Sequence, residues 1–359
     1  MLNPTLPLYT VELGISESLA GIAITAFSIG SLFTRPFAGI LVDRYGRRRL
    51  IFIGAALFLV AFSAYLFTSG FVMMLCIRVL QGVAFCFTST GISTIATDVI
   101  PRQRISEGIG YYALAGAVSM TIGPAIGLKV QELFSMRAIF ILGLCLGCGC
   151  ILVVSNIHYK EVLQKREPGV KTKIKLYEKS SLLPAAMIFV CSISQTALTA
   201  YLALYGKSIG LVGVSNFFLF TSVGTISARA FAGKVTNRFG ELKVLLAAVI
   251  VTACCQFAVS MTTSMTWLIC IALVYGFSYG ILYPVTNALS VKHARPENRG
   301  GANATYTASF DLGAIIGGTI WGVIAGFTGY RVMYMLAAAL VLTAIPLIPL
   351  YKKQYPDEF

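Results

Sequence analysis

The chain has 359 residues, of which 57% are hydrophobic and 12% are charged. Soluble chains average about 25% charged residues, so this composition excludes a disordered, collagen-like or disulfide-scaffold protein and disfavours a soluble enzyme. The net charge is +14, but most basic residues lie in short stretches between apolar segments. That distribution indicates membrane topology rather than nucleic-acid binding, and the predicted class is a polytopic helical membrane protein.

Apolar stretches of about 20 residues, the length at which a helix spans a bilayer, recur along the whole chain. Eleven are expected, at residues 18–41, 49–68, 71–97, 107–131, 136–156, 181–206, 212–236, 243–263, 265–291, 302–327 and 331–351. Basic residues concentrate after every second stretch. The positive-inside rule therefore places those loops and the C-terminus in the cytoplasm, and the protein in the cell membrane as a multi-pass protein.

The first nine residues precede a span that would run from outside to inside, so the topology requires another span before residue 10. Met1–Tyr9 would reach about half a bilayer as a helix. We interpret this segment as the outer end of a first span whose inner half is absent. A short external tail is the alternative.

One long polar stretch, residues 157–180, carries seven basic residues against three glutamates. We interpret it as a basic cytoplasmic linker with an attraction for anionic lipid. It would separate an N-terminal helical bundle, residues 1–156, from a C-terminal helical bundle, residues 181–359. The first bundle would hold spans 1–6, the first incomplete, and the second spans 7–12 and a short tail.

The 9 cysteines all lie in apolar segments. Cys145, Cys148 and Cys150 are close in sequence, but the chain has only 2 histidines, and tetrahedral metal sites require closed sets of Cys and His ligands. We therefore expect no metal, no cofactor and no disulfide framework.

The two halves of the chain repeat each other. Arg35-Pro-Phe-Ala-Gly39 is echoed 194 residues later by Arg229-Ala-Phe-Ala-Gly233, and the loop that follows, Asp43 to Gly46, is echoed at the same offset. A parallel duplication of a six-span unit is a signature of secondary transporters.

The loop after the stretch 18–41 reads Gly39-Ile-Leu-Val-Asp43-Arg44-Tyr-Gly46-Arg47-Arg48-Arg49. It resembles the G-x-L-x-D-R-x-G-R-[RK] signature of the major facilitator superfamily (MFS). The resemblance implies an MFS fold of two six-helix bundles, here with the first helix truncated and about eleven full spans. It also implies that this loop latches the two halves in the outward-facing state. The conformational-switch candidates are Gly39, Asp43, Arg44, Gly46 and Arg47.

The residues themselves give a simpler interpretation of the last part of this loop. Arg47, Arg48 and Arg49 are explained by the positive-inside rule alone. Gly46 permits a tight turn, and Asp43 can bind a neighbouring basic group or a helix N-terminus.

Arg78-Val-Leu-Gln81-Gly82 resembles the R-x-x-Q-G motif of the same superfamily. A charge within a span costs roughly 2.5–3.5 kcal/mol on insertion scales, so such a residue normally faces a cavity or a partner. Arg78 is therefore a proton-coupling candidate and Gln81 a substrate-cavity candidate. An arginine that snorkels to the interface is the alternative.

Gly123-Pro124-Ala-Ile-Gly127 resembles the "antiporter" motif of the exporter branches, although Ser119 and Leu128 replace two of its glycines. Gly and Pro let a helix bend and pack closely, so Gly123, Pro124 and Gly127 are helix-packing candidates. Ordinary packing between spans is the alternative. This motif is the feature that favours export.

Asp311 is the one carboxylate placed deep in a predicted span. A carboxyl group removed from water takes up a proton more readily than an exposed one, and ionisable groups within spans mark proton paths. Asp311 is therefore a second proton-coupling candidate. A structural ion pair with Arg35 is the alternative.

Tyr275, Tyr279 and Tyr283 recur every fourth residue and share one helix face, with Asn287 one turn further on. MFS architecture places this span and the span of Gln195 around the central cavity. The aromatic rings suit a partly apolar or cationic substrate. A packing stripe is the alternative for any single tyrosine.

The chain contains no G-x-x-x-x-G-K-[ST] sequence and no catalytic constellation, so neither ATP-driven transport nor an enzyme is expected. The predicted function is proton-coupled efflux of a small organic molecule, a drug or a metabolite, by alternating access. The expected partners are that substrate, protons and the lipid bilayer, with no nucleic acid, and the expected state is a monomer. The alternatives are a proton-coupled importer on the same fold and a non-transporting truncated relic.

Overall fold

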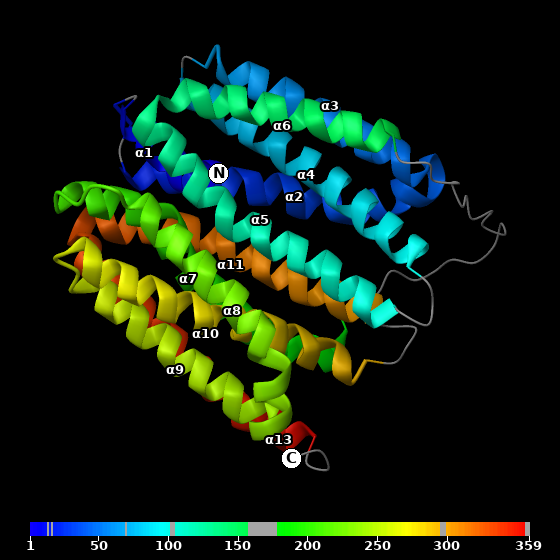
Figure 1. Ribbon diagram of the computed structural model, residues 1–359, viewed down its shortest axis with the longest axis vertical. Helices are drawn as coiled ribbons and strands as arrows, with labels where there is room; N and C mark the ends of the chain where they lie inside the picture. The colour runs from blue at the N-terminus through cyan, green and yellow to red at the C-terminus, as the bar shows by residue number, and fades with distance from the viewer. Residues whose placement is uncertain are drawn as a thin grey trace. The chain divides into compact units, whose positions relative to one another are not determined.

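The computed structural model describes residues 1–12, 14–15, 17–68, 70–100, 105–156, 178–294 and 299–355. Throughout these ranges the regular structure is helical (Figure 1). The helices are α1 (Leu2–Glu12), α2 (Glu17–Tyr45), α3 (Arg47–Tyr65), α4 (Phe71–Val99), α5 (Ile105–Leu133), α6 (Met136–Asn156), the short η2 (Lys179–Ser181), α7 (Leu182–Ser208), α8 (Ser215–Phe239), α9 (Glu241–Ser260), α10 (Met265–Lys292), α11 (Arg299–Thr328), α12 (Tyr330–Leu342) and α13 (Leu347–Gln354).

Apolar residues surround most of these helices, which is the pattern of helices buried in a core or in a membrane. Within the described residues, 8 helical segments are long and apolar enough to cross a bilayer, and Gly21–Arg35 of α2 is a shorter apolar helix. The prediction of an all-helical chain rich in spanning segments is confirmed at this level.

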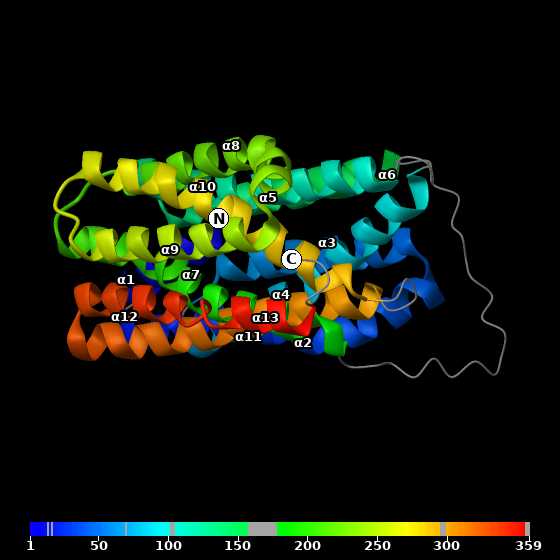
Figure 2. The same cartoon turned by 90° about the horizontal axis from the view of Figure 1, so that it is seen from below.

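Each of the predicted stretches overlaps a helix, but the last one is not continuous. The stretch predicted at 331–351 is divided into α12 and α13 by turns over residues 343–346 (Figure 2). Pro346 precedes the first residue of α13. Because proline has no N–H to donate to the preceding turn, it interrupts one helix and is accepted where the next begins.

The helices form two compact units. One, the N-unit, comprises Ile22–Met120 and Val130–Lys173, and the other, the C-unit, comprises Met1–Gly21, Thr121–Lys129 and Ile174–Phe359. The bundle boundaries expected at 156 and 181 stay a prediction, since most of the linker, residues 157–177, lies outside the described residues.

Glycines let two helices of the N-unit cross with their backbones in contact. A Cβ atom added to Gly30 of α2 would lie 2.2 Å from the carbonyl oxygen of Val79 in α4. A Cβ atom added to Gly82 of α4 would lie 2.1 Å from the carbonyl oxygen of Phe27 in α2. Small residues at helix interfaces are the usual means of close approach in membranes. α4 also packs on α3, and α3 packs on α6.

The C-unit repeats this crossing between α8 and α10. A Cβ atom at Gly224 would lie 2.3 Å from the Leu273 oxygen, and one at Gly276 would lie 2.2 Å from the Thr221 oxygen. α7 packs on α11, and α9 packs on both α10 and α12. The apolar core of this unit joins residues of α7, α9, α10 and α12, among them Ile188, Leu245, Leu282 and Val341.

Aromatic side chains link α7 to its neighbours by hydrogen bonds to main-chain oxygens. Tyr201 donates to the carbonyl oxygen of Gly318 at 2.7 Å, and Trp321 donates its indole N–H to that of Ile193 at 2.7 Å. Tyr334 of α12 donates to the Ala197 oxygen at 3.1 Å. All three donors are buried, so each bond satisfies a polar atom that water cannot reach.

Candidate functional site

The loop that carries the MFS-like signature turns on a glycine. Gly46 precedes α3 with a φ of 93°, a left-handed conformation that favours glycine. Arg44 lies exposed with its guanidinium carbon 5.4 Å from the Tyr45 ring centroid. Gly39 and Asp43 fall within α2, but their surroundings lie outside the described residues.

Arg47 points into the N-unit and forms an ion pair. Its Nε lies 3.1 Å from Oδ2 of Asp98 near the end of α4, and its side chain is 4% exposed against 28% for that of Asp98. The neighbouring Arg48 donates to the main-chain oxygen of Ser155 at 2.6 Å. These contacts tie the start of α3 to the ends of α4 and α6. Interpreting Arg47 as a topology charge alone is therefore wrong, because a solvated charge would not be buried and paired.

An ion pair at the equivalent position of the C-unit has its charges reversed. Lys292 Nζ lies 2.9 Å from Glu241 Oε2, with both side chains about one-third exposed. Glu241 follows Arg47 by 194 residues and Lys292 follows Asp98 by the same number. Sequence reasoning missed both ion pairs. The internal repeat could have revealed them, because a basic and an acidic residue of the first half correspond to an acidic and a basic residue of the second half.

Arg78 lies at the centre of a buried polar cluster in the N-unit. Only 2% of the residue is exposed. Its Nε donates to the main-chain oxygen of Ala23 in α2 at 3.0 Å, and its Nη1 donates to Oε1 of Gln81 at 3.3 Å. Its guanidinium carbon lies 5.0 Å from the Phe27 ring centroid, within the range of a cation–π contact. The arginine is thus held inside the helix bundle and does not reach toward an interface.

Gln81 extends the cluster to a third and a fourth helix. Its Oε1 also accepts a hydrogen bond from the Tyr65 hydroxyl in α3 at 3.2 Å. Tyr65 stacks on Phe140 of α6, with ring centroids 4.7 Å apart and an interplanar angle of 8°. The R-x-x-Q-G motif therefore joins α2, α3, α4 and α6 through Tyr65, a residue that no sequence motif had singled out.

The tyrosines of α10 divide into two groups. Tyr275 and Tyr279 stack with ring centroids 5.8 Å apart, and Tyr279 donates a hydrogen bond to Oε1 of Gln195 in α7. Tyr283 instead makes edge contacts with Tyr306 and Phe310 of α11, at 5.6 and 5.7 Å between ring centroids. The structure thus brings together Gln195 of α7 and Tyr279 of α10, two of the substrate-cavity candidates.

The other candidates of the C-unit are partly buried. Asp311 and Asn287 lie in α11 and α10 with intermediate exposure. Asp311 directly follows Phe310, the ring that contacts Tyr283. Arg35 belongs to the N-unit, so the ion pair expected between Arg35 and Asp311 stays a prediction.

The glycines of the antiporter-like sequence lie against the first residue of the chain. A Cβ atom at Gly127 would come 2.7 Å from the Met1 oxygen, and one at Gly123 would lie 3.4 Å from the Met1 nitrogen. Pro124 lies inside α5. The helix α1 that begins here packs on α7. The packing role assigned to these residues stays a prediction.

The described part of the chain holds no group of three or more His, Cys, Asp or Glu side chains that could bind a metal ion. The 9 cysteines are free thiols.

A comparison with protein-family models decides the family. The model of the Major Facilitator Superfamily matches residues 1–300 and 218–358. The chain belongs to this superfamily. The match confirms the resemblance inferred from the loop at Gly39–Arg49, and with the apolar helices it makes the protein a multi-pass membrane protein.

Curated relatives align over nearly the whole chain. The staphylopine export protein of Staphylococcus aureus (strain Mu50) is 24% identical over 375 residues, covering 99% of this chain and 92% of that protein. Multidrug resistance protein 1 of Bacillus subtilis is 24% identical, covering 95% and 90%. The quinolone resistance protein NorA of S. aureus (strain MRSA252) is 27% identical, covering 95% and 91%.

Solved structures share the fold. The nucleoside transporter NupG matches with a TM-score of 0.76 at 15% identity, covering 98% of this chain and 94% of that one. The human organic anion transporter MFSD10 matches with a TM-score of 0.72 at 14% identity, covering 96% and 88%. At these identities the likeness supports the fold alone.

Proposed function

We propose that this protein exports a small organic molecule, a drug or a metabolite, by alternating access coupled to proton entry. The observation that carries the proposal is the alignment of named export and resistance proteins over 95–99% of the chain. The absence of a phosphate-binding G-x-x-x-x-G-K-[ST] sequence supports a gradient over ATP as the energy source. We infer a transporter and not an enzyme.

The proposed membrane arrangement has about eleven full spans in two helical bundles, with the basic loops and the C-terminus in the cytoplasm. The alternation of basic loops supports this topology. In an alternating-access cycle, substrate and proton each shift the balance between inward- and outward-facing states by their difference in affinity for the two. The protein would do this as a monomer in the cell membrane.

The buried charge of Arg78, the carboxyl group of Asp311 and the stacked tyrosines of α10 support different roles within the proposed cycle. Arg78, buried with Gln81 and Tyr65, supplies a fixed positive charge, and Asp311 supplies a carboxyl group that can gain and lose a proton. The stacked Tyr275 and Tyr279 offer aromatic faces to an apolar or cationic substrate. Asn287 and Tyr283 complete the proposed substrate face.

Conformational switching would act through the loop after α2. The contacts of Arg47 with Asp98 and of Arg48 with Ser155 hold the start of α3 to the ends of α4 and α6. These contacts support a role for the adjoining Asp43 and Arg44 in movements of α3 and α4. Gly39 would permit the helix contact that this loop requires. These residues would alter turnover rather than substrate affinity.

Everted membrane vesicles test the proposal directly. Respiration acidifies the vesicle lumen, so a proton-coupled exporter should accumulate ethidium or a fluoroquinolone inside, and nigericin should abolish the accumulation. Asp311→Asn should lose gradient-driven accumulation while keeping substrate binding and exchange. Glu132→Gln, a change of an exposed carboxylate at the end of α5, is the matched control and should behave as wild type.

The same assay separates the alternatives. Accumulation in right-side-out vesicles, and none in everted ones, would indicate an importer. No gradient-dependent movement of any tested compound in either orientation would indicate a protein that does not transport. Poor folding of Asp311→Asn, restored by Arg35→Gln, would make Asp311 a structural tie and contradict its coupling role.

A further inference from the structure

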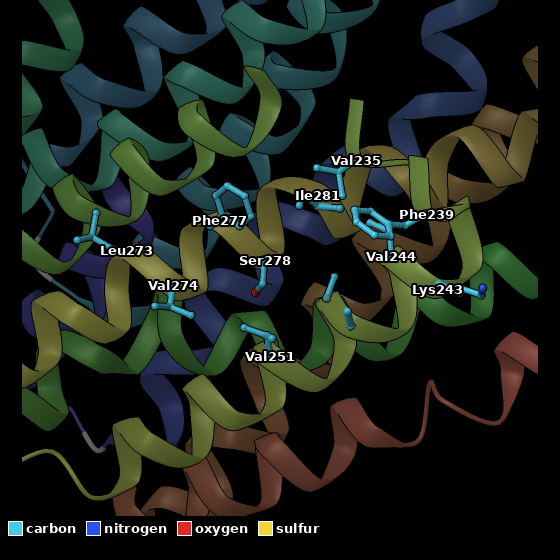
Figure 3. Close-up of a pocket in the computed structure, with 12 residues that line it drawn as sticks. Val235, Phe239, Lys243, Val244, Val251, Leu273, Val274, Phe277, Ser278 and Ile281 are labelled. Atoms are coloured by element: carbon cyan, nitrogen blue, oxygen red, sulfur yellow. The ribbon is translucent and has the colours of Figure 1, made fainter. Parts of the chain in front are cut away.

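A groove with a volume of about 670 Å³ lies in the C-unit between α8, α9 and α10 (Figure 3). Its volume is in the range of small-molecule sites. Its lining is apolar except for Lys243 and Ser278, and comprises Val235, Phe239, Lys243, Val244, Ala247, Ala248, Val251, Leu273, Val274, Phe277, Ser278 and Ile281.

Small residues contribute to the lining. Ala247 and Ala248 of α9 and Ser278 of α10 are small, whereas Phe239 and Phe277 are the largest side chains of the groove. The Ser278 hydroxyl is already engaged, 2.8 Å from the Thr252 hydroxyl and 3.2 Å from the Tyr275 carbonyl oxygen that accepts its hydrogen bond. The floor of the groove therefore suits a hydrocarbon occupant and offers little to a polar one.

The groove is separate from the proposed substrate face. An α-helix turns about 100° per residue, so Val274, Phe277 and Ile281 of α10 lie on the side opposite Tyr275 and Tyr279. The groove-lining residues Val274 and Phe277 are 50% and 39% exposed. Exposed apolar side chains on a membrane-spanning helix are suited to contact with lipid acyl chains.

One end of the groove is basic. Figure 3 shows Leu273 and Val274 at one end and Phe239 and Lys243 at the other. Lys243 is exposed, and the guanidinium carbon of the exposed Arg238 lies 5.5 Å from the Phe239 ring centroid. The nearby carboxylate of Glu241 is paired with Lys292 at 2.9 Å, which leaves the groove entrance with an excess of positive charge.

We propose that this groove binds an acyl chain of an anionic glycerophospholipid, with the phosphate at Lys243 and Arg238. An amphiphile matches both the apolar lining and the basic end of the groove, because the lining accepts its hydrocarbon chain and the two cations accept its headgroup. The positive charge selects an anionic lipid over a zwitterionic one. The bound lipid would hold α8, α9 and α10 together on the side of the unit away from the tyrosines.

Native mass spectrometry of the purified full chain tests the site with two lipids of identical acyl chains, phosphatidylglycerol and phosphatidylcholine. The wild-type protein should bind phosphatidylglycerol several-fold more tightly than phosphatidylcholine. Val274→Trp, which fills the groove, should weaken binding of phosphatidylglycerol at least fivefold. Val332→Trp, at a residue of α12 that is 39% exposed and outside the groove, is the matched control and should have no effect.

The headgroup contact has its own variant pair. Lys243→Gln should remove the preference for phosphatidylglycerol and leave phosphatidylcholine binding unchanged. Lys353→Gln, an exposed lysine of α13, should keep the preference. Equal lipid binding by Val274→Trp and Val332→Trp, or an unchanged preference in Lys243→Gln, would overturn the proposal.

Photo-crosslinking of the wild-type protein gives a result that does not depend on variant folding. Phosphatidylglycerol with a diazirine in its acyl chain should label residues 247–251 and 273–281. Labelling spread evenly over exposed apolar residues of α12 would contradict a specific site. If ethidium or a fluoroquinolone displaces the label and unlabelled phosphatidylglycerol does not, the groove binds a transported compound instead of a lipid. If the protein forms a dimer and the groove is not labelled in that dimer, a second copy of the chain occupies the groove.

Discussion

The crossing of α2 and α4 in the N-unit and that of α8 and α10 in the C-unit have the same register. Gly30 and Gly82 make the first crossing, and Gly224 and Gly276, each 194 residues later in the chain, make the second. A Cβ atom at any of the four would lie 2.1–2.3 Å from a carbonyl oxygen of the partner helix. The duplication has therefore kept the contact between backbones, which only glycine permits.

The side chains beside the two crossings differ completely. Arg78 and Gln81 form the buried polar cluster of the N-unit, whereas the equivalent positions 194 residues on are Ala272 and Tyr275. Tyr275 contributes to an aromatic stack. The comparison shows that crossing geometry and local chemistry vary independently, so one duplicated scaffold carries a charge in one half and aromatic rings in the other.

Adding a methyl group to a crossing glycine should have the largest effect. Gly82→Ala and Gly276→Ala each force two backbones apart, and overpacking costs about 3 kcal/mol at the upper end of its usual range. We expect both variants to lose most of their folded yield and melting temperature in detergent, measured by fluorescence-detected size exclusion.

Gly116→Ala and Gly301→Ala are matched controls, since a Cβ atom at either helical glycine would meet nothing within 4 Å. They should be neutral or stabilising by up to about 1 kcal/mol, because alanine favours the helix. Wild-type stability of Gly82→Ala with loss in Gly276→Ala would show that the two crossings are not equivalent.

Replacing Arg78 by the residue of the other half should have the second largest effect. Arg78→Ala removes the hydrogen bonds that Arg78 donates to the Ala23 oxygen and to Gln81, at a cost of about 2 kcal/mol, and it removes the proposed fixed charge. We expect a lowered melting temperature and loss of ethidium export. Arg78→Lys keeps the charge but not the planar fork of donors, so its export should be intermediate. Export by Arg78→Ala at the wild-type rate would show that the polar cluster around Arg78 is not needed for transport.

The reversed ion pairs should show the smallest effect. A double-mutant cycle on Arg47 and Asp98 should give a coupling of about 1 kcal/mol, since Arg47 is nearly buried. The same cycle on Lys292 and Glu241 should give about 0.3 kcal/mol, as for exposed pairs. The exchange variant Arg47→Glu with Asp98→Lys, which copies the other half, should recover part of the melting temperature lost by each single variant. Equal couplings would show that burial does not distinguish the pairs.

Local sequence patterns were sufficient for most of the fold. Apolar length places a helix at each predicted stretch, and a motif as short as Arg78–Gln81 correctly joins two residues one turn apart. The split of the last stretch at Pro346 was missed because the apolar composition continues through it. The proline itself was the available signal.

Contacts between distant residues were not accessible in the same way. Nothing in the composition of Arg47 to Arg49 distinguishes the one arginine that turns inward to Asp98 from its exposed neighbour Arg49. Tyr65 is recognisable only through its hydrogen bond to Gln81 in another helix. The repeat offset is the one sequence feature that could have linked such positions, because it aligns Arg47 with Glu241.

The hydrogen bonds around α7 have a mechanical consequence. Tyr201, Trp321 and Tyr334 each donate a hydrogen bond from a ring to a main-chain oxygen of a neighbouring helix, so directional bonds as well as apolar packing join α7 to α11 and α12. Apolar contacts permit small sliding movements, whereas a hydrogen bond weakens steeply when its donor moves out of line with the acceptor. We therefore expect α7, α11 and α12 to move together as one rigid group when the protein changes conformation.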